Sequence, residues 1–232
     1  MKHRSEAFRA VQANELYEKK FCDLTIKLNN EIFKYVDFVQ IKNKWKEIDT
    51  GYSYCCENKC INTNNPAGSC IKGNGFVNLI SDENIKYILG KGGCNRDVKV
   101  YAENLFKKPQ NCFKHCLYYF EIKCIFEGEL VNSERIWMNI GLINLNTNKY
   151  IFYSAKSAKI YNEKDEEFKL STSSFNNNDI FGCGLVYHPT NKMNEFPYVF
   201  FTRDGKQIGK GMLIKENFDS YKPCVWLNTL FN

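Results

Sequence analysis

The residues that first suggest chemistry are cysteines gathered in a turn-rich segment. Cys55 or Cys56, together with Cys60 and Cys70, offers thiolate ligands within residues 49–75. Structural zinc sites usually pair their ligands as C-x2-4-C knuckles, and Cys56 with Cys60 forms one such half-site. Cys70 stands alone, with no histidine near it. Ordinary buried or surface thiols therefore explain this segment better than zinc, and we expect neither a metal nor a cofactor.

The glycines of residues 68–73 have the spacing of a phosphate-binding loop. Asn74 and Gly75 stand where that loop requires Lys followed by Ser or Thr. The surrounding residues also show no pattern of a parallel strand followed by a helix. The sequence therefore speaks against nucleotide binding here.

The three histidines, His3, His115 and His188, occur in unrelated sequence contexts, and none belongs to a recognisable nucleophile motif. Cys116 beside His115 does not form a Cys-His dyad through adjacency, because neighbours on a strand point to opposite faces. The sequence therefore predicts no catalytic residues and a protein that is not an enzyme.

Charge and cysteine content also restrict the function. The formal net charge is +6, but the basic residues are spread along the chain and interleaved with acidic ones, which is typical of a solvated surface rather than of a nucleic-acid or membrane partner. There are eleven cysteines, yet no apolar signal segment precedes them and no apolar span reaches the ~18 residues that a membrane helix needs. We expect a cytoplasmic protein with mostly free thiols.

The elements that must position any site are best defined in residues 179–209. Two apolar runs, Ile180–Tyr187 and Tyr198–Arg203, precede Asp204-Gly205 and a third run that starts at Lys206. Asp-Gly between two such runs favours a type I′ turn, because Gly adopts positive φ freely and Asp tolerates it. This stretch predicts antiparallel strands joined by a tight hairpin.

Further strands are predicted by alternation of apolar and polar residues. Residues 117–126 place a row of apolar side chains on one face. The next inward row is Ile136, Met138, Ile140 and Leu142, with Trp137 and Asn139 pointing to the opposite face. We interpret residues 155–170 as a charged connection and residues 5–20 as a short helix.

Short strands separated by turn residues predict an all-β protein, a bent two-sheet antiparallel β-sandwich with a short N-terminal helix. We expect residues 1–30 to form that helix and a linker, and residues 31–232 to form the sandwich domain.

Separated pieces of the sequence resemble, in order and spacing, the SPRY family with its preceding PRY-like segment. The pieces are YYFEI at 118–122, IGL at 140–142, DIFGCGLV at 179–186, VFFTRDGKQIG at 199–209 and YKPCVWL at 221–227. The resemblance covers about residues 45–227. Residues 43–48 and 73–76 are also similar to SPRY proteins of plant-parasitic nematodes and to the Ran-binding-protein type of SPRY domain.

The resemblance implies a concanavalin A-like sandwich that binds a protein or peptide partner through loops at one end or through a concave surface. It implies no catalysis. The loops it suggests are residues 129–135, residues 144–149 and the residues after Trp226. We select Tyr101, Trp137, Tyr153 and Asn228 as candidate contacts, because aromatic side chains give a large contact area at low entropic cost. An equally simple interpretation is that Trp137 and Tyr153 only cover the second sheet.

The sequence departs from the family at its C-terminal end. SPRY domains continue beyond the Tyr-x-Pro strand into another core strand, whereas this sequence ends with Asn228 to Asn232 after that strand. A missing strand would leave backbone groups unpaired on its neighbours, so we expect marginal stability.

A carbohydrate-binding, lectin-like sandwich is the alternative function, because such proteins share the architecture. Asn176, Asn177 and Asn178 with Asp179 would supply polar groups, and Trp137 an aromatic platform. A simple turn explains the asparagine run better.

Overall fold

The computed structural model describes residues 36–49, 75–88, 97–126, 136–170, 175–191, 195–215 and 219–229. The chain divides into two units, Met1–Asp37 and Phe38–Asn232. The short strand β1 (Val36–Phe38) spans the boundary between them. The helix expected in residues 5–20 and the cysteines at 55, 56, 60 and 70 lie outside the described ranges.

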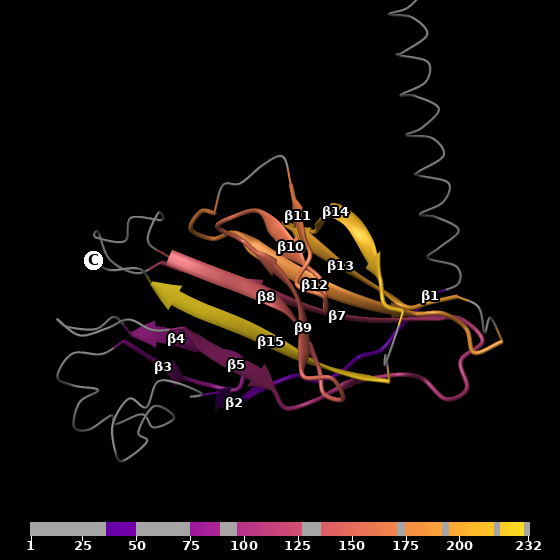
Figure 1. The fold of residues 1–232 in the computed structure, drawn as a ribbon. Coiled ribbons are helices and arrows are strands. Elements are labelled where there is room, and N and C mark those ends of the chain that lie inside the picture. The colour runs from indigo at the N-terminus through magenta and orange to yellow at the C-terminus, as the bar shows by residue number, and fades with distance from the viewer. Residues whose placement is uncertain are drawn as a thin grey trace, which may run out of the picture. The chain divides into compact units, whose positions relative to one another are not determined.

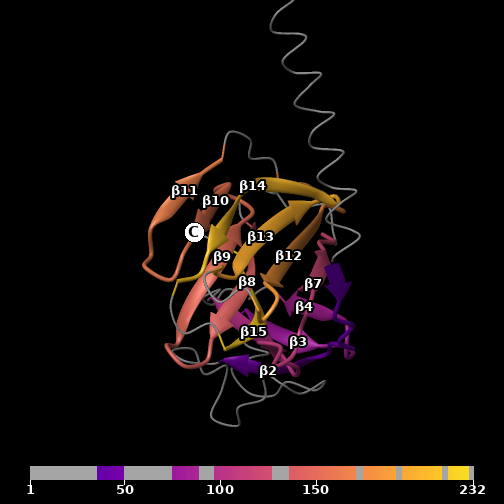
Figure 2. The ribbon, with the colours of Figure 1, turned by 90° about the vertical axis from the view of Figure 1, so that its right-hand side faces the viewer.

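The first sheet of the Phe38–Asn232 unit contains four antiparallel neighbours. They are, in order, β7 (His115–Lys123), β12 (Ile180–Tyr187), β13 (Tyr198–Arg203) and β14 (Lys206–Leu213), and Figure 2 shows them side by side. Asp204 and Gly205 have φ angles of 50° and 73°, so both central residues of the β13–β14 turn adopt positive φ. The predicted strands and the predicted Asp-Gly hairpin are confirmed.

The second sheet is larger, with 8 strands that all pair in the antiparallel sense. Its path is β11 (Glu167–Lys169), β10 (Lys159–Tyr161), β9 (Lys149–Ser154), β8 (Ile136–Asn144), β15 (Ser220–Thr229), β5 (Val98–Ala102) and β2 (Trp45–Asp49), and β6 (Phe106–Lys107) also pairs with β15. In Figure 1, β8, β15 and β5 follow one another across this sheet.

Residues 155–170 differ from the prediction, because they contain β10 and β11 rather than only a charged connection. A turn at residues 155–158, with Ala158 at a φ of 49°, brings β10 back onto β9. Lys159 and Glu167 then form an ion pair across β10 and β11. Their charges are tolerated because this end of the sheet is an exposed edge.

The core lies between the two sheets. Met138, Ile140 and Leu142 of β8 are at most 2% exposed, and they belong to one apolar cluster with Phe181 and Leu185 of β12. Side chains at alternate positions of both strands therefore fill one interior. The described residues confirm the predicted all-β sandwich.

A second apolar cluster lies under the hairpin of β3 (Phe76–Leu79) and β4 (Ile85–Ile88). Its buried members include Phe76 and Val77 of the hairpin and Val98 and Val100 of β5. Trp45 packs against both clusters, and its ring meets the Phe120 ring edge-on with 6.2 Å between centroids. Trp45 therefore links β2 to both parts of the interior.

β15 is paired on both sides, with β8 along one edge and β5 along the other. The expected loss of a final strand and the expected marginal stability stay predictions. A search of the described ranges for a helix with the length and apolar character to span a membrane finds none.

Candidate functional site

The outer side of the 8-stranded sheet carries a layer of aromatic rings. Along β15, Tyr221 and Val225 enter the core, so the intervening Trp226 points to the opposite side. Its ring lies 4.8 Å from that of Tyr150 and 4.3 Å from that of Phe152, between centroids. Phe152 in turn stacks on Tyr161 at 4.6 Å. We call Tyr150, Phe152, Tyr161 and Trp226 the aromatic face.

Lysine side chains lie over these rings. Lys99 Nζ is 4.5 Å from the centre of the Tyr150 ring and 5.1 Å from that of Trp226. Lys222 Nζ lies 5.6 Å from the centre of the Tyr101 ring and forms an ion pair with Glu47. Each ammonium group is attracted by the negative face of a ring. Lys99 is therefore the cation that lies over two rings of the aromatic face, whereas Lys222 lies over the neighbouring Tyr101.

A small buried cluster supports the aromatic face. Tyr101, Ile143 and Cys224 are 7%, 5% and 1% exposed, and Tyr150 packs against them. The hydroxyls of Tyr101 and Tyr150 are 2.9 Å apart and share a hydrogen bond. Burial raises the pKa of the Cys224 thiol, against a smaller opposing effect of Lys99. Cys224 is therefore a neutral packing residue rather than a nucleophile.

Several polar atoms beside the aromatic face are buried and have no hydrogen-bond partner within the described part of the chain. They are Trp137 Nε1, Asn139 Oδ1, Ser154 Oγ and Trp226 Nε1. Asn139 is opposite Trp226 on one neighbouring strand and opposite Ser154 on the other. Buried polar groups are nearly always satisfied in native proteins, so these four atoms are unusual among the groups beside the aromatic face.

The predicted contact residues fall on both sides of this sheet. Trp137 of β8 is opposite Asn228 of β15, and Lys156 Nζ lies 5.1 Å from the centre of the Trp137 ring. Tyr101 is buried beneath the aromatic face. Tyr153 is 3% exposed and lies in the main core, where its ring is 6.0 Å from that of Phe201. Its neighbour Phe152, which is not among the predicted contacts, faces outward instead, onto Trp226.

Of the loops that the family resemblance suggests, residues 129–135 lie outside the described ranges. Residues 144–149 contain the β8–β9 turn, and the Asn144 side chain holds this turn in place. The Asn144 side chain is fully buried, and its Oδ1 accepts the N–H groups of Asn146 and Thr147 at 2.9 and 3.2 Å. Its Nδ2 donates to Glu163 Oε1 at 3.1 Å and to the Tyr221 hydroxyl at 3.2 Å. One amide thus fixes the turn to the core.

The asparagine run before β12 forms a turn. The N–H of Asn176 donates to Asp179 Oδ2, and Asn177 Oδ1 accepts the N–H of Phe126, both at 2.8 Å. Asn178 has a positive φ of 71°. The amide oxygen of Asn177 therefore fastens the turn to the chain after β7, which supports the turn interpretation over the sugar site.

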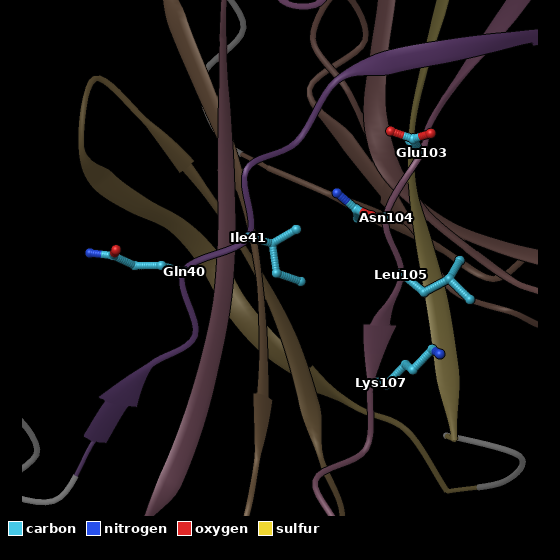
Figure 3. Close-up of a pocket in the computed structure, with 6 residues that line it drawn as sticks. All are labelled: Gln40, Ile41, Glu103, Asn104, Leu105 and Lys107. Atoms are coloured by element: carbon cyan, nitrogen blue, oxygen red, sulfur yellow. The ribbon is translucent and has the colours of Figure 1, made fainter.

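A surface hollow of about 510 Å³ is lined by Gln40, Ile41, Glu103, Asn104, Leu105 and Lys107. Figure 3 shows the Gln40 side chain pointing away from the other lining residues. Lys46 and Lys44 bind Glu103 and lower its pKa, and Asn104 Nδ2 donates to the carbonyl oxygen of Lys42. These contacts tie residues 42–46 to the loop before β6, so Glu103 and Asn104 already have structural partners.

The histidines differ from the sequence interpretation. His115 and His188 were assigned to unrelated contexts, but the pairing of β7 with β12 brings their rings to 4.9 Å between centroids. Glu195 lies beside them. Their sequence separation hid this arrangement, because it depends on which strands are neighbours.

No family model matches the chain, and no curated protein matches it. Among solved structures, it is similar to a human SPRY domain, with 21% identity, coverage of 66% of this chain and 89% of that chain, and a TM-score of 0.45. It is also similar to the SPRY domain of human HERC1, with 17% identity, coverage of 60% and 79%, and a TM-score of 0.38. The metal-free carbohydrate recognition domain of Emp46p has 10% identity, coverage of 67% and 78%, and a TM-score of 0.37. All three TM-scores lie below 0.5, a level at which a likeness does not establish function.

Proposed function

We propose that this chain is a SPRY-type interaction module that binds a protein or peptide partner without catalysis. The aromatic face carries the proposal, because the rings of Tyr150, Phe152 and Trp226 lie together and only partly buried on one side of the sheet. Aromatic residues dominate the energetic centres of protein interfaces. β8 and β15, which carry two pieces of the SPRY resemblance, are neighbours in the same sheet.

The charge beside these rings favours an acidic partner segment. Lys222 already has Glu47 as a partner, whereas the Lys99 ammonium group lies over the Tyr150 and Trp226 rings, with Asp49 opposite Lys99 in the β2–β5 register. A carboxylate of the partner would pair with Lys99 while an apolar side chain packed on Trp226. We therefore expect a segment that combines acidic and apolar residues, bound faster at low salt.

The predicted contacts have different parts in this proposal. Trp137 extends the proposed binding surface along β8, and Asn228 is opposite Trp137 in the β15–β8 register. Tyr101 supports it from below, whereas Tyr153 acts through the core. The proposal includes a cytoplasmic location, without nucleic-acid or membrane partners. Among the described cysteines, Cys124, Cys183 and Cys224 are free and buried, whereas Cys112 and Cys116 are joined by a disulfide.

Affinity capture from cell extract followed by a binding titration tests this function. The face variant combines Phe152→Ala with Trp226→Ala, and the control is Leu213→Ala, which changes a 61% exposed side chain on the other sheet. A partner that is captured by the wild type should bind the face variant at least about 30-fold more weakly, the effect of losing a 2 kcal/mol hot spot. Full binding by a folded face variant would overturn the proposal.

A carbohydrate ligand is the second candidate, favoured by the unpaired Asn139 Oδ1, Ser154 Oγ and tryptophan Nε1 atoms. A sugar has hydroxyls that both donate and accept, so it suits this mixture. It ranks second because these atoms are covered and the rings would have to move to admit a sugar. Glycan-array binding that disappears in Trp137→Ala would favour a lectin; binding only to a protein would favour the module.

A further inference from the structure

The strands of the smaller sheet bring two imidazoles and a carboxylate to one point. Tyr187 is the last residue of β12 and pairs with Cys116 of β7. One position further, His188 meets His115, and the distance from His115 Nε2 to His188 Nδ1 is 3.0 Å. Glu195 enters from the segment before β13, the next strand of the sheet, with Oε2 2.7 Å from His188 Nδ1.

The hydrogen-bonding capacity of His188 does not match this environment. Its Nδ1 carries at most one hydrogen, yet it faces both the His115 nitrogen and the Glu195 carboxylate. One proton cannot make two well-aligned bonds. A cation between the three groups would instead accept a lone pair from each of them. The ligand atoms all lie within 4.8 Å of one another, so small side-chain movements are sufficient.

We propose that His115, His188 and Glu195 bind a divalent transition-metal ion, with Zn²⁺ as the best match. Two histidines and one carboxylate are a common zinc ligand set, and bonds of about 2.0–2.2 Å would hold them around a tetrahedral ion. Such a set leaves a fourth position for water or another ligand. The Glu195 side chain is 42% exposed and that of His188 is 16% exposed, so the ion has a route from solvent.

The backbone holds both histidine-bearing segments in place. The N–H and hydroxyl of Thr190 both donate to the carbonyl oxygen of Cys112, at 2.8 and 3.1 Å. Cys112 and Cys116 lie on either side of the turn that leads into His115, and one disulfide joins them. The Tyr198 ring lies 5.9 Å from that of His188 and restricts its movement. Residues 112–116 and 187–190 thus bring the two histidines together before an ion binds.

The metal site is separate from the aromatic face. His188 shares the side-chain direction of Gly182 and Gly184, where Tyr119 and Phe200 cover the outer side of the smaller sheet. The aromatic face lies on the outer side of the other sheet. Metal binding can therefore succeed or fail independently of partner binding.

Titration of the full chain with CoCl₂ and ZnCl₂ tests the site. Co²⁺ held by nitrogen and oxygen ligands gives visible absorption without the strong near-ultraviolet band of thiolate ligands, so the spectrum separates this site from cysteines. We expect one equivalent of Co²⁺ to bind with this spectrum and to be displaced by Zn²⁺. We also expect Zn²⁺ to raise the thermal midpoint of unfolding. His115→Gln and His188→Gln should each weaken metal binding at least about 100-fold. Losing a residue that only hydrogen-bonds to a metal ligand can already weaken binding by up to that factor, and these residues are the ligands themselves.

His3→Gln is the matched control, since it removes the remaining histidine and should leave the titration unchanged. Glu195→Gln changes an exposed surface residue, so it tests the site without endangering the fold, and it should weaken binding at least about tenfold. Absence of the cobalt spectrum, a spectrum with only thiolate character, or unchanged affinity in folded Glu195→Gln and histidine variants would overturn the proposal.

Discussion

Replacing Asn144 by Asp should convert a satisfied buried amide into a pair of opposed carboxylates. The amide donates to Glu163 Oε1 at 3.1 Å and to the Tyr221 hydroxyl at 3.2 Å. Asp keeps the size of Asn and still accepts the N–H groups of Asn146 and Thr147, so the β8–β9 turn retains its bonds. The change is confined to the side of the residue that faces Glu163 and the Tyr221 hydroxyl.

The expected loss of stability is the smaller of two energies, the charge repulsion and the free energy of protonation. Two charges 3.1 Å apart repel by about 5 kcal/mol at an effective dielectric constant of 20. Taking up a proton avoids this repulsion, and for a carboxyl whose pKa is ordinarily near 4 it costs about 4 kcal/mol at pH 7. The smaller value applies, so Asn144→Asp should lower the free energy of unfolding by about 4 kcal/mol at pH 7.

The pH dependence has a definite sign. The shared proton raises the pKa of the carboxyl pair in the folded variant above its value in the unfolded chain. Stability is then fully present below about pH 4 and is lost as the pH rises through the folded pKa. At pH 4 a protonated Asp can donate to Glu163 as the amide does, and the difference from wild type should shrink to about 1 kcal/mol.

Urea unfolding at pH 7 and pH 4, followed by tryptophan fluorescence, measures both values. Asn144→Ala should cost about 3 kcal/mol at either pH, because it removes the hydrogen bonds without adding charge. Asn146→Asp is the control: it lies in the same turn but is exposed, so it should change stability by no more than about 0.5 kcal/mol. Equal stability of Asn144→Asp and wild type at pH 7, or no recovery at pH 4, would refute the reasoning.

Other features predict simpler effects. Burial raises the pKa of the Cys124 thiol to about 12, so its contribution to stability should be fully present below pH 9. Between pH 9 and 12 the free energy of unfolding should fall by up to about 1.4 kcal/mol per pH unit, and urea unfolding of the wild type and of Cys124→Ala measures the difference. Arg203→Met should lower the free energy of unfolding by roughly 3–5 kcal/mol, because it removes the positive charge that pairs with Asp179. The Asp179 side chain belongs to a residue that is 8% exposed, and it accepts a hydrogen bond from Arg203 at 2.8 Å. A loss under about 1 kcal/mol in chemical unfolding would contradict this. Gly205→Ala should lower the free energy of unfolding by about 1 kcal/mol. An added Cβ would meet no atom within 4 Å, so the loss comes from the positive φ of +73°. Gly205→Asn should lower it less in the same assay, because Asn tolerates this conformation.

The sequence was most informative where short-range chemistry determines the structure. The β13–β14 turn requires positive φ at Asp204 and Gly205, and those residue types are uncommon together elsewhere in a strand pattern. The inward row on β8 followed from simple alternation. The charged segment that forms β10 and β11 could not be recognised in this way, because β10 is only three residues long and the edge strand β11 is exposed at all three positions.

The direction of side chains on β9 shows a different limit. Residues 150–153 are Tyr, Ile, Phe and Tyr, so every position is apolar and alternation cannot tell which ones face the core. The structure directs Ile151 and Tyr153 inward and Phe152 outward, onto Trp226 of a strand more than 60 residues later. Only the neighbour relations β9–β8–β15 bring those rings together, and no local pattern encodes them.

The histidine site depends on the same kind of long-range information. His115 and His188 are separated by 73 positions, and each alone is an ordinary residue at a strand end. They face each other only because β7 and β12 pair with Tyr187 opposite Cys116, and a shift of the register by one residue would turn one imidazole to the other side of the sheet. The register that buries Tyr118 and Leu185 in the core is thus the register that aligns the histidines. Core packing and metal affinity should therefore be coupled: a variant that loosens this pairing should lose affinity for Zn²⁺ even when all three ligands are intact.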